Sequence, residues 1–219
     1  MLKRAFSLAV EWELIEKSPA RFVRLFHEEG KIERYLSEEE LQRLMAVLET
    51  HENRTVCLIV QFLLFTGCRK SEALNLRWEF VDLVNRIARL PAHLSKGRKI
   101  RTLILSEQAV DVLRKLDTRG ESSYCFLNRR TGKNYTTIDK TFRRIMKKAN
   151  IDNFSPHCCR HTFISYVLQS GRSLFDAQHL ASHSYSKITE KYAHLSTKSL
   201  QDAANSASDI ISGAMRRSG

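Results

Sequence analysis

The sequence predicts a mainly α-helical fold with one small antiparallel β-sheet, an α+β arrangement. Apolar residues recur at helical spacing through most of the chain, and only 8 Gly and 3 Pro interrupt its 219 residues. Residues 78–105 instead carry three short apolar runs separated by turn-forming residues. A chain of this length, with 42% apolar and 27% charged residues, can bury one good core with at most a small appendage.

The first predicted helix covers residues 2–16 and is stopped by Ser18-Pro19. Residues 20–36 are charged and irregular, which is typical of a linker. A helix that begins at the first residue has nothing before it to pack on. We therefore expect residues 1–35 to be the last helix and linker of a truncated upstream domain, and residues 36–219 to form the main domain with a C-terminal helix.

Helix signals then mark the start of the main domain. Ser37 followed by Glu40 forms a capping box, and Gly67 is typical of a helix end. Three helices are predicted here. The first runs from the capping box to about residue 50, the second covers residues 55–66, and the third begins near Arg69.

The sheet is predicted from the runs WEFVDL, NRIARL and IRTLIL, which are bounded by turn signals at Asn85, at 95–97 and at Ser106. Ser106 then caps a helix to about Leu116, and the apolar run YCFL that follows is ambiguous. Further helices are expected at 137–149, 156–169 and 173–181, and a last amphipathic helix carries Leu200 to Ala214.

The charge balance indicates a polyanionic partner. The chain has 36 Lys and Arg against 24 Asp and Glu, a net charge of +12, and a pI near 9.7, so nucleic acid is the leading candidate. No window reaches the roughly 18 uncharged apolar residues of a membrane span, and charges in the first 20 residues exclude a signal peptide. We therefore place the chain in the cytoplasm, with its five cysteines reduced.

The segment SPHCCRHTFISYV, residues 155–167, invites a zinc interpretation that its geometry disfavours. On a helix, His157, Arg160 and His161 share one face while the two cysteines between them turn away, and no second Cys or His pair completes a tetrahedral site. A His-x-x-Arg at the start of a helix suits a phosphate instead. Such a pair also occurs by chance on solvated faces, so alone it is a weak signal.

Other polar residues stand out by their context. Arg69 lies at the start of a helix, with Glu72 three residues on and able to hold its guanidinium from the same face. Lys96 lies at the tip of the predicted hairpin, and Tyr192 follows His183 by nine residues. Each has a plain structural explanation on its own: a surface ion pair, a solvated basic turn, or a core aromatic.

Together, and in this order, these residues resemble the catalytic domain of the tyrosine recombinases, the phage-type integrases. The family pattern is an Arg in a TGxRxxE context, a hairpin Lys, a His-x-x-Arg, and a His with a Tyr nine residues later. The resemblance covers about residues 36–195 and implies this family's catalytic-domain fold, with residues 1–35 as the end of its core-binding domain. The matching residues are Arg69 with Glu72, Lys96, His157 with Arg160, His183 and Tyr192.

Two positions depart from the family pattern. The family usually has Asp-Leu where this chain has Cys158-Cys159, and Gly where it has Ser182. These are supporting positions rather than reacting groups. We interpret both cysteines as small hydrophobes that pack against neighbouring helices.

The resemblance implies a site-specific DNA recombinase that breaks and rejoins strands through a 3′-phosphotyrosyl intermediate, without ATP, metal or other cofactor. Tyr192 is the implied nucleophile, and its phenol, with a pKa of about 10, needs His157 to take or relay its proton. Lys96 is the implied general acid for the departing 5′-oxygen. The phosphate charge is offset by Arg69, Arg160 and His183, with Glu72 in support.

Several alternatives stay open. Tyr185 is a rival nucleophile, and the hairpin residues Arg98, Lys99 and Arg101 are expected to meet the DNA backbone unless they are simply solvated. The expected partner is a double-stranded DNA recombination site, bound by a tetramer of a protein that is a monomer or weak oligomer when free. A type IB topoisomerase-like strand transferase and a noncatalytic DNA-binding module are the alternative functions.

Overall fold

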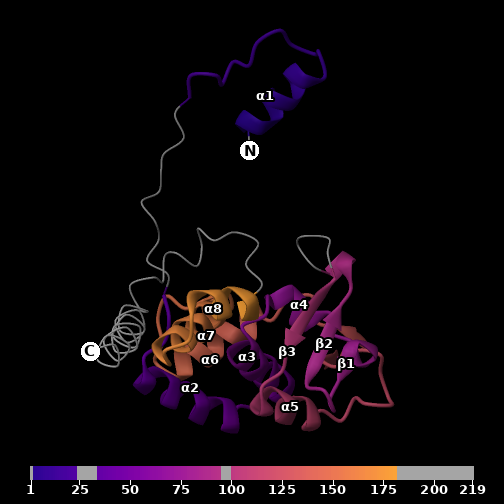
Figure 1. Cartoon of the computed structure of the whole chain (residues 1–219), viewed down its shortest axis with the longest axis vertical. Helices are drawn as coiled ribbons and strands as arrows, with labels where there is room; N and C mark the ends of the chain where they lie inside the picture. The colour runs from indigo at the N-terminus through magenta and orange to yellow at the C-terminus, as the bar shows by residue number, and fades with distance from the viewer. Residues whose placement is uncertain (1, 24–33, 95–99, 182–219) are drawn as a thin grey trace, which may run out of the picture. The chain divides into compact units, whose positions relative to one another are not determined.

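The structure, a computed structural model, describes residues 2–23, 34–94 and 100–181, and the chain divides into two compact units, Met1–Ile32 and Glu33–Gly219 (Figure 1). In the first unit, helix α1 covers Leu2–Glu11 and is shorter than predicted. Glu13 adopts a left-handed conformation with φ 57°, and the amide of Leu14 donates to the carbonyl of Ala9 at 2.8 Å. This closing turn ends the helix well before Ser18-Pro19.

The second unit is mainly helical and is built around α3, a helix that is apolar on nearly every side and almost wholly buried. Helix α3 contacts α2, α4, α5, α6 and α7, and α8 packs on α7 (Figure 1). The helices are α2 (Glu38–Thr50), α3 (Arg54–Thr66), α4 (Lys70–Leu74), α5 (Glu107–Arg114), α6 (Asp139–Lys148), α7 (Cys158–Gln169) and α8 (Leu174–Ala181).

The helix signals of the sequence are confirmed to within a residue or two at most ends. The hydroxyl of Ser37 accepts from the amide of Glu40 at 3.2 Å, and the Glu40 carboxylate accepts from the Ser37 amide at 3.0 Å, which completes the capping box. Gly67 ends α3 in the left-handed conformation. The predicted helix from Leu200 to Ala214 lies outside the described residues.

The predicted antiparallel sheet is present at one side of this unit, in the order β1-β2-β3 (Figure 1). Its strands are shorter than the apolar runs, because Trp78–Phe80 forms a 3-10 turn instead of the start of a strand. The ambiguous YCFL run ends in a second, two-stranded sheet. The strands are β1 (Val81–Asp82), β2 (Ile87–Leu90), β3 (Arg101–Ile104), β4 (Leu127–Asn128) and β5 (Lys133–Asn134).

The register of β2 and β3 decides which hairpin side chains are buried. Leu90 lies opposite Arg101, and Ala88 lies opposite Leu103, and all four are buried. The residues between them face solvent. Arg101 therefore begins β3 with its side chain on the buried face of the sheet.

Gly67 is required by both its backbone and its surroundings. Its φ is 58°, and a Cβ at this position would clash with the ring of Phe163 on α7. We expect Gly67→Ala to cost roughly 1–2 kcal/mol of left-handed strain plus about 1–3 kcal/mol of overpacking. Gly132→Ala is the matched control, since Gly132 has φ 66° but no atom within 4 Å of the added Cβ.

Urea unfolding of both variants measures the two costs. Gly132→Ala is expected to show the backbone penalty alone, so the difference between the variants reports the contact with Phe163. Equal losses of unfolding free energy in the two variants would show that α7 yields to the added methyl group.

None of the helices in the described part of the chain is long and apolar enough to cross a membrane.

Candidate active site

Arg69 immediately precedes α4 and is held by Glu72, as the spacing predicts. The backbone amide of Arg69 donates to Glu72 Oε2 at 2.8 Å, and its guanidinium donates to Oε1 at 2.9 Å. The Glu72 side chain is 0% exposed, whereas that of Arg69 is 24% exposed. The carboxylate therefore fixes a guanidinium that still reaches the surface.

Arg101 corrects one expectation, because its side chain is only 6% exposed and does not project from a solvated hairpin. One guanidinium nitrogen forms an ion pair with Glu72 Oε2, and Nη2 donates to the carbonyl oxygen of Leu180, on α8, at 3.3 Å. The cause is the strand register, which turns Arg101 inward beside Leu103. A signal for this was present in the sequence, since Arg101, Leu103 and Leu105 alternate with Thr102 and Ile104.

Arg160, on α7, is among the largest fully buried side chains of the described residues. Its Nη1 donates to the carbonyl oxygen of Gly67 at 2.7 Å, so the turn that ends α3 orients this guanidinium. Burial, together with the positive charges of Arg101 and Arg69, lowers the pKa of Arg160 from 12.5 to about 10. Glu72 opposes this effect but does not cancel it.

Glu72 is the carboxylate that this group of arginines shares. Burial acts to raise the pKa of Glu72, but the charge of Arg101 and the hydrogen bonds from Arg69 outweigh it and hold the pKa below its usual value. Glu72 is therefore ionised at neutral pH. We call Arg69, Glu72, Arg101 and Arg160 the arginine cluster. It sets three guanidinium groups around one carboxylate, and this excess of positive charge suits an anion.

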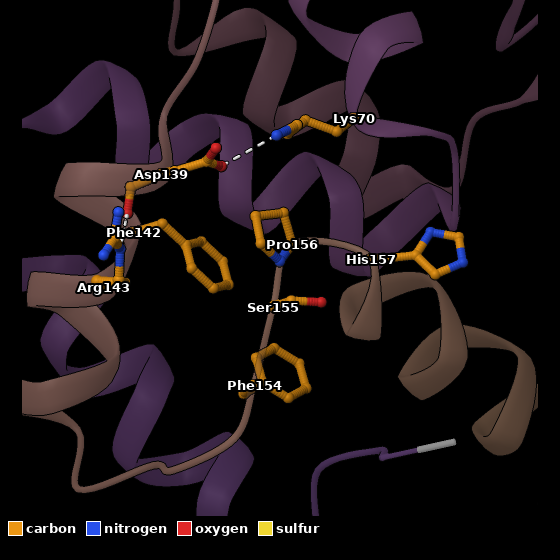
Figure 2. A pocket seen from close by; sticks show the side chains of 8 residues that line it. All are labelled: Lys70, Asp139, Phe142, Arg143, Phe154, Ser155, Pro156 and His157. Carbon is orange, nitrogen blue, oxygen red and sulfur yellow. Dashed lines mark hydrogen bonds and ion pairs between the residues drawn. The ribbon is translucent and has the colours of Figure 1, made fainter. Parts of the chain in front are cut away.

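His157 lies at the start of α7, which begins two residues later than predicted. It is exposed, and its ring meets that of His161 edge-on with centroids 4.7 Å apart. Figure 2 shows it at the rim of a pocket of about 550 Å³, with its ring pointing away from the phenylalanines. The other residues lining this pocket are Lys70, Asp139, Phe142, Arg143, Phe154, Ser155 and Pro156.

The two cysteines between His157 and Arg160 are confirmed as packing residues. Cys159 lies in the hydrophobic core, and Cys158 packs against it while accepting from the amide of Ser155 at 3.4 Å. Burial raises the pKa of Cys159, and raises that of Cys68 to about 11. Within the described ranges, no three His, Cys, Asp or Glu side chains gather as metal ligands do.

The remaining site residues that the sequence predicts lie outside the described residues. The chain that leads to His183 can be followed as far as α8, whose Leu180 contacts Arg101. The structure thus brings together Arg69, Glu72 and Arg160, adds Arg101 and the Gly67 carbonyl to them, and places His157 at the start of the same helix as Arg160. The residues outside are Lys96, Arg98, Lys99, His183, Tyr192 and the rival Tyr185.

Comparison with known proteins shows that this chain is similar to integrases and tyrosine recombinases. The model of the phage integrase family matches residues 34–199. The chain is 30% identical over 213 residues to the tyrosine recombinase XerC of Bacillus pumilus, covering 91% of this chain and 70% of XerC. It is 24% identical to the integrase of Salmonella phage P22, covering 92% of this chain. The crystal structure of XerA recombinase matches with a TM-score of 0.63 and 31% identity, covering 79% of this chain.

These relatives are longer than this chain. It spans 53% of the P22 integrase and 65% of the XerA chain.

Proposed function

Because this chain belongs to the phage integrase family, we propose that it is the catalytic part of a site-specific DNA recombinase. It breaks and rejoins DNA strands through a 3′-phosphotyrosyl intermediate. The observation that carries this proposal is the arginine cluster, in which three guanidinium groups surround one buried carboxylate. A phosphodiester is an anion that oriented guanidinium groups bind well.

Charge stabilisation is the task of Arg69 and Arg160. As a nucleophile attacks phosphorus, negative charge builds on the nonbridging oxygens of a five-coordinate transition state. Donors that are already oriented stabilise this charge without reorganising at the moment of reaction. Glu72 orients Arg69, and the Gly67 carbonyl orients Arg160. His183 donates a further hydrogen bond to a nonbridging oxygen.

The bond exchange is the task of Tyr192 and its partners. The phenol oxygen of Tyr192 forms a bond to phosphorus, and the bond from phosphorus to the 5′-oxygen breaks. His157, exposed one helical turn before Arg160, takes or relays the phenolic proton, and Lys96 gives a proton to the departing 5′-oxygen. A strand with a free 5′-hydroxyl later reverses these steps. One ester replaces another, so the exchange needs no ATP.

The partner is double-stranded DNA, bound by a tetramer. The net charge of +12 favours the DNA backbone whatever its sequence. The tetramer follows from the family resemblance and from the exchange itself, because joining two duplexes requires four strand cleavages with one tyrosine at each. A type IB topoisomerase-like enzyme has the same chemistry but needs no second duplex.

The test is covalent capture of DNA. The protein is incubated, with EDTA and without ATP, with a pool of nicked duplexes taken from the DNA on either side of its own gene. A nick close to the cleavage point releases the short strand and traps the adduct. We expect a protein-DNA adduct that resists boiling in detergent and is enriched for one sequence. No adduct with any duplex, although the DNA is bound, would favour a noncatalytic binding module, and relaxation of plasmids that lack the captured site would favour a topoisomerase.

A further inference from the structure

We propose that Arg101 is a positioning residue that couples Arg69 to the chain segment leading to His183 and Tyr192. This inference rests on the proposed function and assigns to Arg101 a task other than contact with the DNA backbone.

The contacts of Arg101 join two elements through one guanidinium. On one side it pairs with Glu72 of α4, and the same carboxylate holds the guanidinium and amide of Arg69. On the other side it donates to the carbonyl of Leu180, three residues before His183. Arg101 also lies five residues after Lys96 in the chain. Arg101 therefore joins α4, which Arg69 immediately precedes, to α8, the helix that precedes His183 in the chain.

A purely stabilising role explains this arrangement poorly. A buried ion pair is weak evidence for stability, because apolar residues of similar size often do as well or better. Arg101 also acts unfavourably on Arg160, whose pKa its charge lowers. A fixed orientation for Glu72, and through it for Arg69, is a benefit that an apolar side chain cannot supply.

The chemistry of the contact requires arginine rather than lysine. A planar guanidinium can donate to the Glu72 carboxylate from one nitrogen and to the Leu180 carbonyl from another. A lysine ammonium is a compact charge on a flexible stem, so it is not expected to hold both partners in one geometry. Arg101→Lys should therefore keep the charge and lose the coupling.

Three variants test the proposal on the full chain, using a duplex captured by the wild-type protein. In Arg101→Lys and Arg101→Met, single-turnover adduct formation should fall about 10- to 100-fold, while the Kd for DNA and its dependence on salt stay as in the wild type. A residue that contacts a phosphate would instead reduce the slope of log Kd against log salt by about 1. The variant Glu72→Gln/Arg101→Met also removes the carboxylate that holds Arg69, so its cleavage should be at least as slow as that of Arg101→Met. The thermal midpoint of each variant checks that slow cleavage is measured on folded protein.

Arg86→Met is the matched control, because Arg86 forms an exposed ion pair with Glu107 at 2.9 Å beside the same sheet. This variant should cleave DNA at the wild-type rate. Wild-type cleavage in the double variant, or a reduced salt slope in Arg101→Met, would overturn the positioning role. Rescue of cleavage by Arg101→Lys would overturn it too, because charge alone would then suffice. Failure of the wild-type protein to form any adduct would instead overturn the proposed function.

Discussion

Replacing Tyr192 with Phe is expected to abolish the covalent protein-DNA adduct while leaving DNA binding close to that of the wild type. The variant keeps the aromatic ring and loses only the hydroxyl oxygen, the atom that forms the bond to phosphorus in the proposed mechanism. No other group can form a phosphotyrosyl link at that position, so the adduct should fall to background. The measurement is adduct yield on a nicked duplex that the wild-type protein captures, together with the Kd of that duplex.

Tyr185→Phe is the control, because Tyr185 lies two residues after His183 and is the rival nucleophile in the sequence. It should form the adduct at the wild-type rate. If Tyr185→Phe loses the adduct and Tyr192→Phe keeps it, the nucleophile is misassigned although the reaction class stands. If both variants keep it, the attacking group is not either tyrosine, and peptide mapping of the captured DNA would locate the true nucleophile.

The sequence predicted best those features that depend on neighbouring residues. The capping box at Ser37 and the contact between Arg69 and Glu72 both arise from groups three residues apart on one helix turn. The short strands followed from apolar runs between turn signals. Such features need no knowledge of the tertiary structure, so a local pattern is enough to predict them.

The features that the sequence did not predict depend on packing between distant segments. The hydrogen bond from Arg160 to the Gly67 carbonyl joins residues 93 positions apart, and no local pattern indicates it. The inward position of the Arg101 side chain depends on strand register. The sequence indicates this register, because Arg101 alternates with Leu103 along the strand, but the basic residues around Arg101 favoured a contact with the DNA backbone instead. The early end of α1 depends on the left-handed conformation of Glu13, a residue with no preference for that conformation.

The arginine cluster shows a conflict between stability and function. Arg160 is deeply buried near the positive charges of Arg69 and Arg101, and both effects act against its charged form. The lowered pKa of Arg160 expresses this cost, because it means that the folded protein disfavours the charged form relative to the unfolded chain. In the proposed mechanism, a bound phosphate brings a negative charge that favours the charged form of Arg160.

Arg160→Met should therefore change stability and activity in opposite directions. Removing the buried cation relieves desolvation and repulsion, and Met is a flexible apolar side chain that can fill the space. The lost hydrogen bond to the Gly67 carbonyl offsets this by about 0.5–1.5 kcal/mol. The thermal midpoint should thus be equal to or above that of the wild type, while adduct formation falls about 10²- to 10³-fold.

Arg114→Met and Arg160→Lys complete the comparison. Arg114 forms an exposed pair with Asp111, so its loss should change neither quantity. Arg160→Lys keeps a positive charge but loses the planar fork, so its cleavage should stay well below wild type. If Arg160→Met lowers the thermal midpoint and the folded fraction still cleaves normally, Arg160 is a structural residue. Only a variant that stays folded yet fails to cleave shows that this buried charge is retained for the phosphate, because a residue kept for stability cannot be removed without loss of stability.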